Sequence, residues 1–199
     1  KTKFISQLIE NGWHGIAYAG VFTITNIFFV ISIENTNVAN TLIMIALAPM
    51  LSAVISFIFL KENTDQKTWI AIIITTLAVI YIFYGSFERG DFLGNFLGLV
   101  CATGLAVGAV IIRSAKKINL VPSAMMGKLM VTLIALLFAD NLVLKGNDSI
   151  IIPLMCIMCV AIPFVLITLA PRYISAAEVN LFFLLETILG PIWVWLGIK

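Results

Sequence analysis

Charged side chains are scarce in this sequence. Asp, Glu, Lys and Arg make up 11% of its 199 residues, whereas they make up roughly a quarter of a soluble domain. Histidine occurs once and the three cysteines all lie inside apolar runs, so the sequence offers no metal-ligand cluster and no disulfide framework. It also lacks a basic cluster for nucleic acid, a nucleotide-binding loop of the G-x-x-x-x-G-K kind, and any loop long enough to form a soluble domain. The scarcity of charged residues and the lack of long loops indicate a membrane protein whose function lies inside the bilayer.

Apolar residues are what the sequence has in abundance. They make up 61% of the chain, and the mean hydropathy is +1.10. A membrane-spanning helix needs about 20 predominantly apolar residues, and seven runs approach or exceed this length. They lie at 15–33, 38–60, 68–85, 93–112, 123–143, 150–170 and 176–198. We therefore predict an all-α, polytopic membrane helix bundle.

Lysine and arginine are distributed unevenly between the two sides of the membrane that these runs define. One side holds Lys1, Lys3, Lys61, Lys67, Arg113, Lys116, Lys117 and Arg172, and the other holds Arg89, Lys145 and Lys199. Because cytoplasmic loops carry the excess of basic residues, the first side is predicted to be cytoplasmic. The N-terminal stretch lies on that side and contains an amphipathic patch that suits the membrane interface.

Two segments of the chain repeat the same pattern. Asn37 to Lys61 and Ser175 to Lys199 align without a gap at an offset of 138 residues. Both have a small polar start, an apolar body, a break in the middle, an aromatic end and a terminal lysine. Because the topology gives the two segments opposite directions across the membrane, the repeat is predicted to be inverted. Between them, Gly94 with Gly98 and Gly104 with Gly108 show the four-residue spacing that predicts close helix packing.

The repeated segments resemble a known family. The stretches "TNVANTLIMIALAPMLSAVISFIFLKE", "WIAIIITTLAVIYIF" and "RYISAAEVNLFFLLETILGPIWVWLGIK" are similar to the EamA-type repeat of the drug/metabolite transporter superfamily. The resemblance implies ten spans in two inverted five-helix repeats around a central cavity. It assigns residues 1–86 to helices three to five of the first repeat and residues 87–199 to helices six to nine of the second. On this resemblance the first two helices and the last helix of the family fold are not in this sequence.

Two positions depart from the family pattern. The usual leucine, glutamate, proline triplet reads Leu185, Glu186 and Thr187 here, with proline displaced to Pro191, so the kink position in this helix is open. The usual glycines of the fifth family helix are replaced by Ala71 and Ala78, which still permit close approach.

Two carboxylates and one lysine lie within apolar runs. From a helix start near Ser175, Glu178 lies about 5 Å and Glu186 about 16 Å into a core about 30 Å thick. A charge at that second depth is costly, so we predict that Glu186 takes part in a proton relay or a cation contact, the alternative being a helix-locking hydrogen bond. Lys128 lies about 9 Å inside the cytoplasmic end of its run. It is predicted either to pair with Glu178 as a cytoplasmic gate or to extend to the surface.

Further polar and aromatic side chains lie at similar depth on the two repeated helices and on the run at 15–33. The predicted substrate-binding residues are Asn26, Asn40, Thr41, Met44, Phe182 and Glu186. Each polar member has an alternative role as an interhelical contact. Pro49 and Pro163 lie near the middle of their runs and predict helix kinks, whereas Pro122, Pro153 and Pro171 are expected to mark helix boundaries.

Together these features predict a secondary transporter of small organic solutes, such as metabolites, amino acids or drugs, that works by alternating access around a midplane cavity. The alternative is a membrane-embedded enzyme that uses an intramembrane glutamate as acid or base. No cofactor and no metal are expected. The expected partners are the lipid bilayer and a small-molecule substrate, with protons and a second copy of the chain as further candidates, in a bacterial inner membrane.

Overall fold

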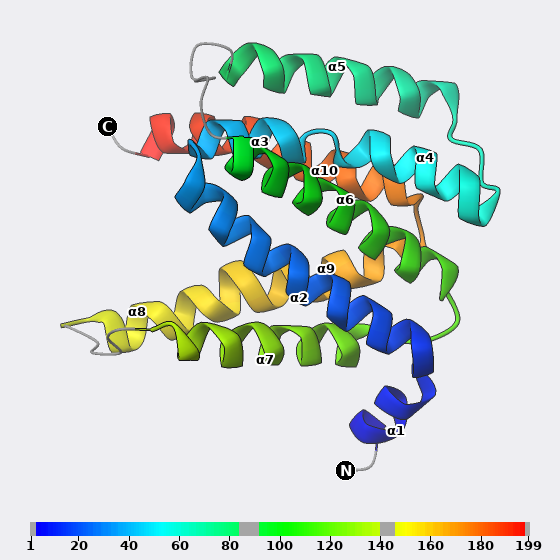
Figure 1. Ribbon diagram of the computed structural model, residues 1–199, viewed down its shortest axis with the longest axis vertical. Coiled ribbons are helices and arrows are strands. Elements are labelled where there is room, and N and C mark those ends of the chain that lie inside the picture. The colour runs from blue at the N-terminus through cyan, green and yellow to red at the C-terminus, as the bar shows by residue number, and fades with distance from the viewer. Residues whose placement is uncertain (1–2, 84–91, 140–145, 198–199) are drawn as a thin grey trace.

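The computed structural model describes residues 3–83, 92–139 and 146–197, and the side chains of Lys3 and of residues 82–83, 186–188 and 190–197 lie outside the described set. The described residues form a bundle of helices whose axes are roughly aligned, and no strand occurs among them (Figure 1). The predicted all-α bundle is confirmed.

Each predicted run corresponds to one helix or to consecutive helices, preceded by a short amphipathic helix, α1 (Lys3–Glu10). The first three runs form α2 (Gly12–Asn35), α3 (Val38–Ile45) with α4 (Ala48–Leu60), and α5 (Gln66–Phe83). The others form α6 (Phe92–Ser114), α7 (Val121–Leu137), the series α8 (Asp148–Met155), η2 (Cys156–Ala161), α9 (Ile162–Leu169) and η3 (Ala170–Arg172), and finally α10 (Ala176–Gly197). Helix α7 ends before the predicted boundary at Val143, and residues 140–145 are outside the described ranges.

Four of the described helical stretches are long and apolar enough to cross a membrane. They are Gly12–Asn35, Val38–Leu60, Phe92–Ser114 and Asp148–Arg172. Shorter apolar helices cover Gln66–Tyr81, Val121–Leu137 and Ala176–Leu185. The chain is therefore an integral, multi-pass membrane protein.

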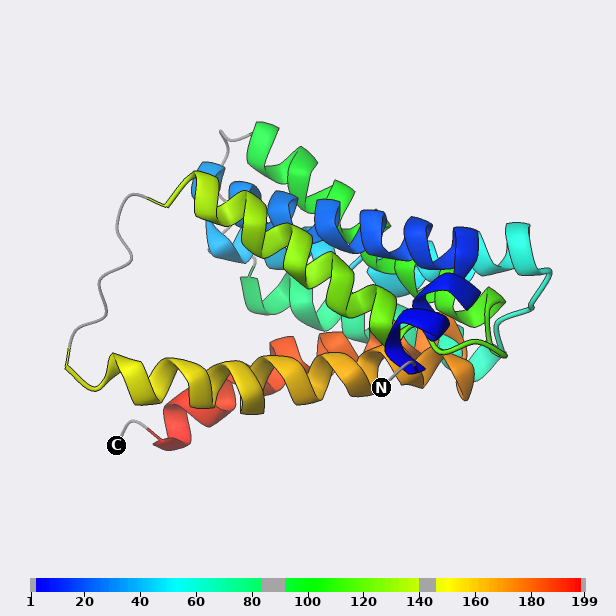
Figure 2. The same ribbon diagram turned by 90° about the horizontal axis from the view of Figure 1, so that it is seen from below.

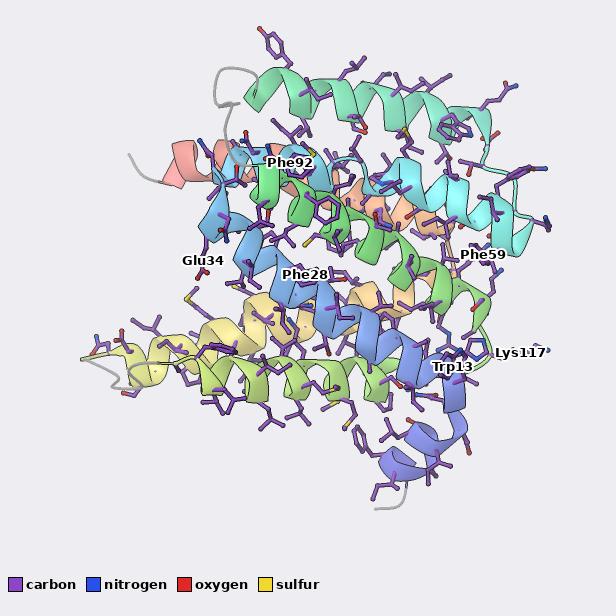
Figure 3. All side chains as sticks on the ribbon, viewed as in Figure 1. Trp13, Phe28, Glu34, Phe59, Phe92 and Lys117 are labelled. Atoms are coloured by element: carbon purple, nitrogen blue, oxygen red, sulfur yellow. The ribbon has the colours of Figure 1, made fainter. Side chains whose placement is uncertain are left out.

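The connections between helices lie at two opposite ends of the bundle. Figure 3 shows Glu34 and Phe92 at one end, and Trp13, Phe59 and Lys117 at the other. The second end carries the α4–α5, α6–α7 and η3–α10 connections. These connections and the helix ends beside them hold Lys61, Lys67, Arg113, Lys116, Lys117 and Arg172, which are six of the eight basic residues assigned to the cytoplasm. This alternation agrees with the predicted topology, and we call this end the cytoplasmic end.

Helix α6 packs closely along α2 because glycines remove side chains from the contact. A Cβ atom built on Gly94 would lie 2.5 Å from Thr36 Cβ, and one built on Gly104 would overlap Thr25 Oγ1. Without a hydrophobic driving force between helices in lipid, such close backbone approach is a main source of attraction. The glycine pairs therefore pack helices, as predicted.

Two of the long helical stretches are interrupted near their middle. Helices α3 and α4 are separated at Ala46 and Leu47, and Pro49 is the second residue of α4. The π-helical segment η2 precedes Pro163, which is the second residue of α9. Pro153 lies inside α8 rather than at a helix boundary, which corrects the expectation for that residue. Because proline lacks an N–H and its ring clashes with the preceding turn, these positions interrupt the regular hydrogen-bond pattern.

The two repeated segments cross each other in the bundle. Figure 1 shows α3 and α4 running in the direction opposite to α10. The 138-residue offset pairs Ala46 with Leu184, and both belong to one buried cluster with Val79. It also pairs Ile43 with Leu181, and both pack against that cluster. Equivalent positions of the two segments therefore belong to one cluster, and the inverted relation between the segments stays a prediction.

Candidate binding cavity

A cavity of about 770 Å³ lies among α2, α3, α6, α7, η2, α9 and α10. Its lining is mostly apolar, and its polar or ionisable members are few. They are Tyr18, Thr25, Asn26, Cys101, Lys128 and Asn180. Among the described lining residues, Lys128 is the only charged side chain. The lipid-embedded bundle therefore contains an apolar chamber with one positive charge.

The Lys128 ammonium group is held inside the cavity by an amide and two aromatic rings. Its Nζ donates a hydrogen bond to Asn26 Oδ1 at 3.1 Å. The same Nζ lies 3.9 Å from the ring centre of Phe164 and 5.0 Å from that of Phe22. The negative ring faces attract the ammonium charge, so these contacts favour a lysine that stays in the cavity over one that extends to the surface.

Asn26 is fixed in the orientation that this contact needs. Its Nδ2 donates to the backbone oxygen of Phe22 at 2.7 Å, which leaves Oδ1 to accept from Lys128. The structure therefore brings together two sequence-predicted residues, Asn26 and Lys128, although Lys128 was predicted to contact a different residue.

The cavity is closed at its cytoplasmic end. Tyr18 Oη and Thr168 Oγ1 form a hydrogen bond at 3.4 Å between α2 and α9. A buried apolar cluster of Tyr18, Ile112, Ala115, Leu120 and Ala124 fills the space beside it. Solutes in the cavity are therefore separated from the cytoplasmic side by packed side chains.

At the opposite end, α7 and α8 diverge, as Figure 2 shows. Every residue from Ser149 to Ile162 is exposed in the described structure. Over this stretch the described residues of α8 and η2 are therefore packed against few other described elements.

A second group of charges connects three elements at the cytoplasmic end. We call Glu62, Arg113 and Lys116 the cytoplasmic ion-pair cluster. Arg113 Nε lies 3.0 Å from Glu62 Oε2, and Lys116 Nζ lies 3.2 Å from Glu62 Oε1. Arg113 Nη1 also donates to the backbone oxygens of Pro171 and Ile174, at 3.3 and 3.1 Å. The cluster thus ties the α4–α5 connection to the end of α6 and to the turn before α10.

The charges in this cluster set the ionisation of Glu62. Partial burial raises the pKa of the Glu62 carboxyl, but the hydrogen bonds and positive charges of Arg113 and Lys116 outweigh it. The net result is a pKa below the usual value for glutamate. Glu62 is therefore ionised, and its pairs are formed, at neutral pH.

Asn40 and Thr41 lie outside the cavity, in a polar network between helices. Asn40 Nδ2 donates to Thr36 Oγ1 at 3.1 Å. Thr41 Oγ1 lies 2.8 Å from Ser32 Oγ, which also donates to the backbone oxygen of Gly94. In this structure both residues therefore make contacts between helices, which is the alternative role stated for them above. Such contacts are expected because a buried polar group in lipid is stable only with a hydrogen-bonding partner.

Met44 and Phe182 also lie outside the cavity. Met44 packs toward Gly98 of α6. Phe182 is 63% exposed on the outer face of α10, and the neighbouring Phe183 lines the cavity instead. One residue corresponds to about 100° around a helix, so the packing of Leu181 and Leu184 against α3 and α5 turns Phe182 outward. The side chain of Glu186 lies outside the described set.

Lys128 and Glu178 do not pair in this structure. Glu178 Oε2 accepts from the backbone N–H and the hydroxyl of Ser175, at 2.7 and 2.8 Å, and its own N–H donates to Ser175 Oγ. This is a capping box at the start of α10. The predicted ion pair is corrected accordingly: a local partner three residues away satisfies the carboxylate, and Lys128 contacts Asn26.

Sequence reasoning missed several residues of this region. Tyr18 and Thr168 close the cavity, and Asn180, 1% exposed, lines it while donating to Ser52 Oγ of α4. A signal for Asn180 existed, because it is a polar residue two positions after Glu178 in an apolar run. Among the described residues, no group of three or more His, Cys, Asp or Glu side chains could hold a metal ion.

Comparison with known proteins gives one match. Residues 2–84 match the sequence profile of the EamA-like transporter family, which confirms the resemblance over that part of the chain. No curated protein and no solved structure matches the chain.

Proposed function

Because the family match indicates a membrane transporter of the drug/metabolite type, we propose that the chain carries small organic solutes across the bilayer by alternating access. The observation that carries this proposal is the cavity of about 770 Å³ inside the bundle. Binding cavities for small molecules typically have about 300–1,000 Å³, mostly apolar walls and a few polar groups. The match is to a transporter family and so does not support the alternative of an intramembrane enzyme.

Alternating access also needs elements that bend, and the structure supplies two. The α3–α4 break and the π-helical segment η2 interrupt long helices, and residues beside each of them line the cavity: Leu42 and Ile45 in α3, Val160 in η2, and Phe164 in α9. Interrupted helices at a substrate site are a recurrent feature of secondary transporters. We propose that residues 1–86 and 87–199, as two inverted units, rock about the cavity to open its cytoplasmic end.

The proposed path is tested by filling the cavity. Val21 lines it, whereas Ile24 lies three residues along α2 and is 51% exposed on the outer face. Val21→Trp is expected to remove most of the solute flux, because the indole ring takes up space that the solute needs, and Ile24→Trp is expected to retain it. Uptake and efflux of a solute panel in proteoliposomes measure both. Equal fluxes in the two variants would show that the solute does not pass through this cavity.

Proton coupling through Glu186 stays a prediction from the sequence. Its depth of about 16 Å in the bilayer is the reason for it. If Glu186 carries a proton, Glu186→Gln is expected to abolish the dependence of flux on a pH gradient. The measurement is transport in proteoliposomes with and without that gradient, and an unchanged dependence would exclude the role. The bacterial inner membrane and a homodimeric state likewise stay predictions.

A further inference from the structure

The charge distribution of the cavity indicates the kind of solute that it binds. Lys128 brings one positive charge, and no described residue of the cavity lining carries a negative charge. We propose that the solute is an apolar molecule with one carboxylate, and that the Lys128 ammonium group binds this carboxylate. The inference rests on the proposed transport function and names its substrate class.

The geometry leaves Lys128 able to bind an anion. An ammonium group has three N–H donors, and the described structure shows one of them donated to Asn26 Oδ1. The rings of Phe22 and Phe164 hold the charge but accept no conventional hydrogen bond. Within the described part of the chain, two donors are therefore left for the oxygens of a carboxylate at the cavity surface.

The surroundings make an anion favourable. A charge inside a lipid-embedded bundle has lost most of its hydration, and an unpaired one is costly. A neutral amide and two ring faces compensate this cost only in part, whereas a carboxylate forms a charge-assisted hydrogen bond and neutralises the site. A cationic solute would instead meet a like charge.

The remaining walls suit an apolar body. Away from Lys128 the cavity is lined by Phe29, Ile45, Leu105 and Phe183, which come from four different helices. A solute with its carboxylate at Lys128 would place its hydrocarbon or aromatic part against these side chains, where burial of apolar surface is favourable. A strongly polar anion such as inorganic phosphate would leave its other oxygens without partners.

Binding of a charge-matched pair of probes tests the inference. We would measure binding of 3-phenylpropionate and of 3-phenylpropylammonium to the full chain in nanodiscs by isothermal titration calorimetry. The carboxylate is expected to bind and the ammonium to bind at least about tenfold more weakly, as the loss of a charge-assisted hydrogen bond implies. Equal binding of the two probes, or no binding of 3-phenylpropionate, would overturn the proposal, and this comparison needs no variant.

Variants locate the effect at Lys128. Lys128→Met is expected to weaken 3-phenylpropionate binding by about tenfold or more, and Lys128→Arg to retain most of it. Lys117→Met, at an exposed position of the cytoplasmic end, removes the same charge and is expected to bind as the unchanged protein does. Helical circular dichroism and a single elution peak report folding. Unchanged binding by folded Lys128→Met would contradict the inference.

Measurements of solute flux distinguish a failure of this inference from a failure of the proposed transport function. Transport of a neutral or cationic solute, blocked by Val21→Trp and unaffected by Lys128→Met, would leave the transport function standing and refute the carboxylate site. Lys128-dependent binding of 3-phenylpropionate without flux of any solute would support the site and refute transport by this chain.

Discussion

Gly104→Ala is expected to destabilise the bundle strongly, whereas Gly108→Ala, one turn further along the same helix, is expected to be tolerated. An alanine Cβ at position 104 would overlap Thr25 Oγ1 and lie 3.1 Å from Thr25 Cβ. Thr25 is 7% exposed and β-branched, so rotating its side chain does not clear the Cβ contact, and α2 and α6 must separate. Overpacking of this kind costs about 1–3 kcal/mol.

Gly108→Ala provides the matched control. Its added Cβ would lie 3.5 Å from a ring carbon of Tyr18, which is an ordinary van der Waals distance. Alanine in place of glycine inside a helix is stabilising by about 0.5–1 kcal/mol where it fits. Thermal unfolding of both variants in the same detergent, followed by circular dichroism, gives the comparison. Equal midpoints would show that the α2–α6 contact is not as close as the structure has it.

The helices could be predicted because the bilayer leaves the backbone few alternatives. In hydrocarbon every backbone N–H and C=O must be paired within the segment, so an apolar run of sufficient length becomes a helix. The interruptions within these helices are harder to predict from the sequence. Pro49 gave a direct signal for the α3–α4 break, but the π-helical segment at 156–161 lies between Pro153 and Pro163 and has no residue pattern that specifies it.

The site was predicted less well, and Asn40 and Thr41 show why. Both are at the right depth and on one helix, and a sequence gives no means of telling whether a polar side chain faces a cavity or a neighbouring helix. The packing of α3 against α2 and α6 decides it, because Ser32 of α2 and Thr36, the residue that follows α2, offer hydrogen bonds to these two residues. Leu42 and Ile45 of the same helix line the cavity instead.

Lys128 and Glu178 show that the sequence also does not tell which partner a charged side chain contacts. Their depths were read from the helix rise, and the lysine does lie in the interior, beside Asn26. The sequence S-A-A-E at 175–178 also fits a capping box, and a partner three residues away requires no long-range packing. Local chemistry therefore took precedence over the pairing that depth alone indicated.

Arg113→Met is expected to loosen the cytoplasmic closure of the cavity. Arg113 donates to the Glu62 carboxylate and to the backbone oxygens of Pro171 and Ile174, so its loss removes four hydrogen-bond contacts that hold three elements together. Charge-assisted hydrogen bonds contribute about 1.5–3 kcal/mol when buried, and partial exposure of this cluster places the expected loss near the lower value. Lys116→Met removes only the Lys116–Glu62 pair, in which the basic side chain is more exposed than Arg113 is, so its effect is expected to be smaller.

Cys101 provides a native reporter of this closure, because it lines the cavity and is 1% exposed. In a protein with Cys156 and Cys159 replaced by alanine, a membrane-impermeant maleimide applied from the cytoplasmic side should label Cys101 slowly. The Arg113→Met variant should be labelled faster, and Lys116→Met should lie between the two. The same order is expected for thermal unfolding at neutral pH.

Acid should reproduce the effect of Arg113→Met in the unchanged protein. The pKa of Glu62 is lowered in the folded chain, so its unfolded form binds a proton more readily than its folded form. The stabilisation is therefore fully present above the unfolded pKa of about 4.3 and is lost as the pH falls through the lower folded value. The unfolding midpoint of the unchanged protein should fall in this acidic range toward that of Arg113→Met, since the variant already lacks one of the two Glu62 pairs that acid breaks. A constant difference between the two proteins from neutral pH to below pH 4 would mean that Arg113 acts through the backbone oxygens of Pro171 and Ile174 and not through Glu62.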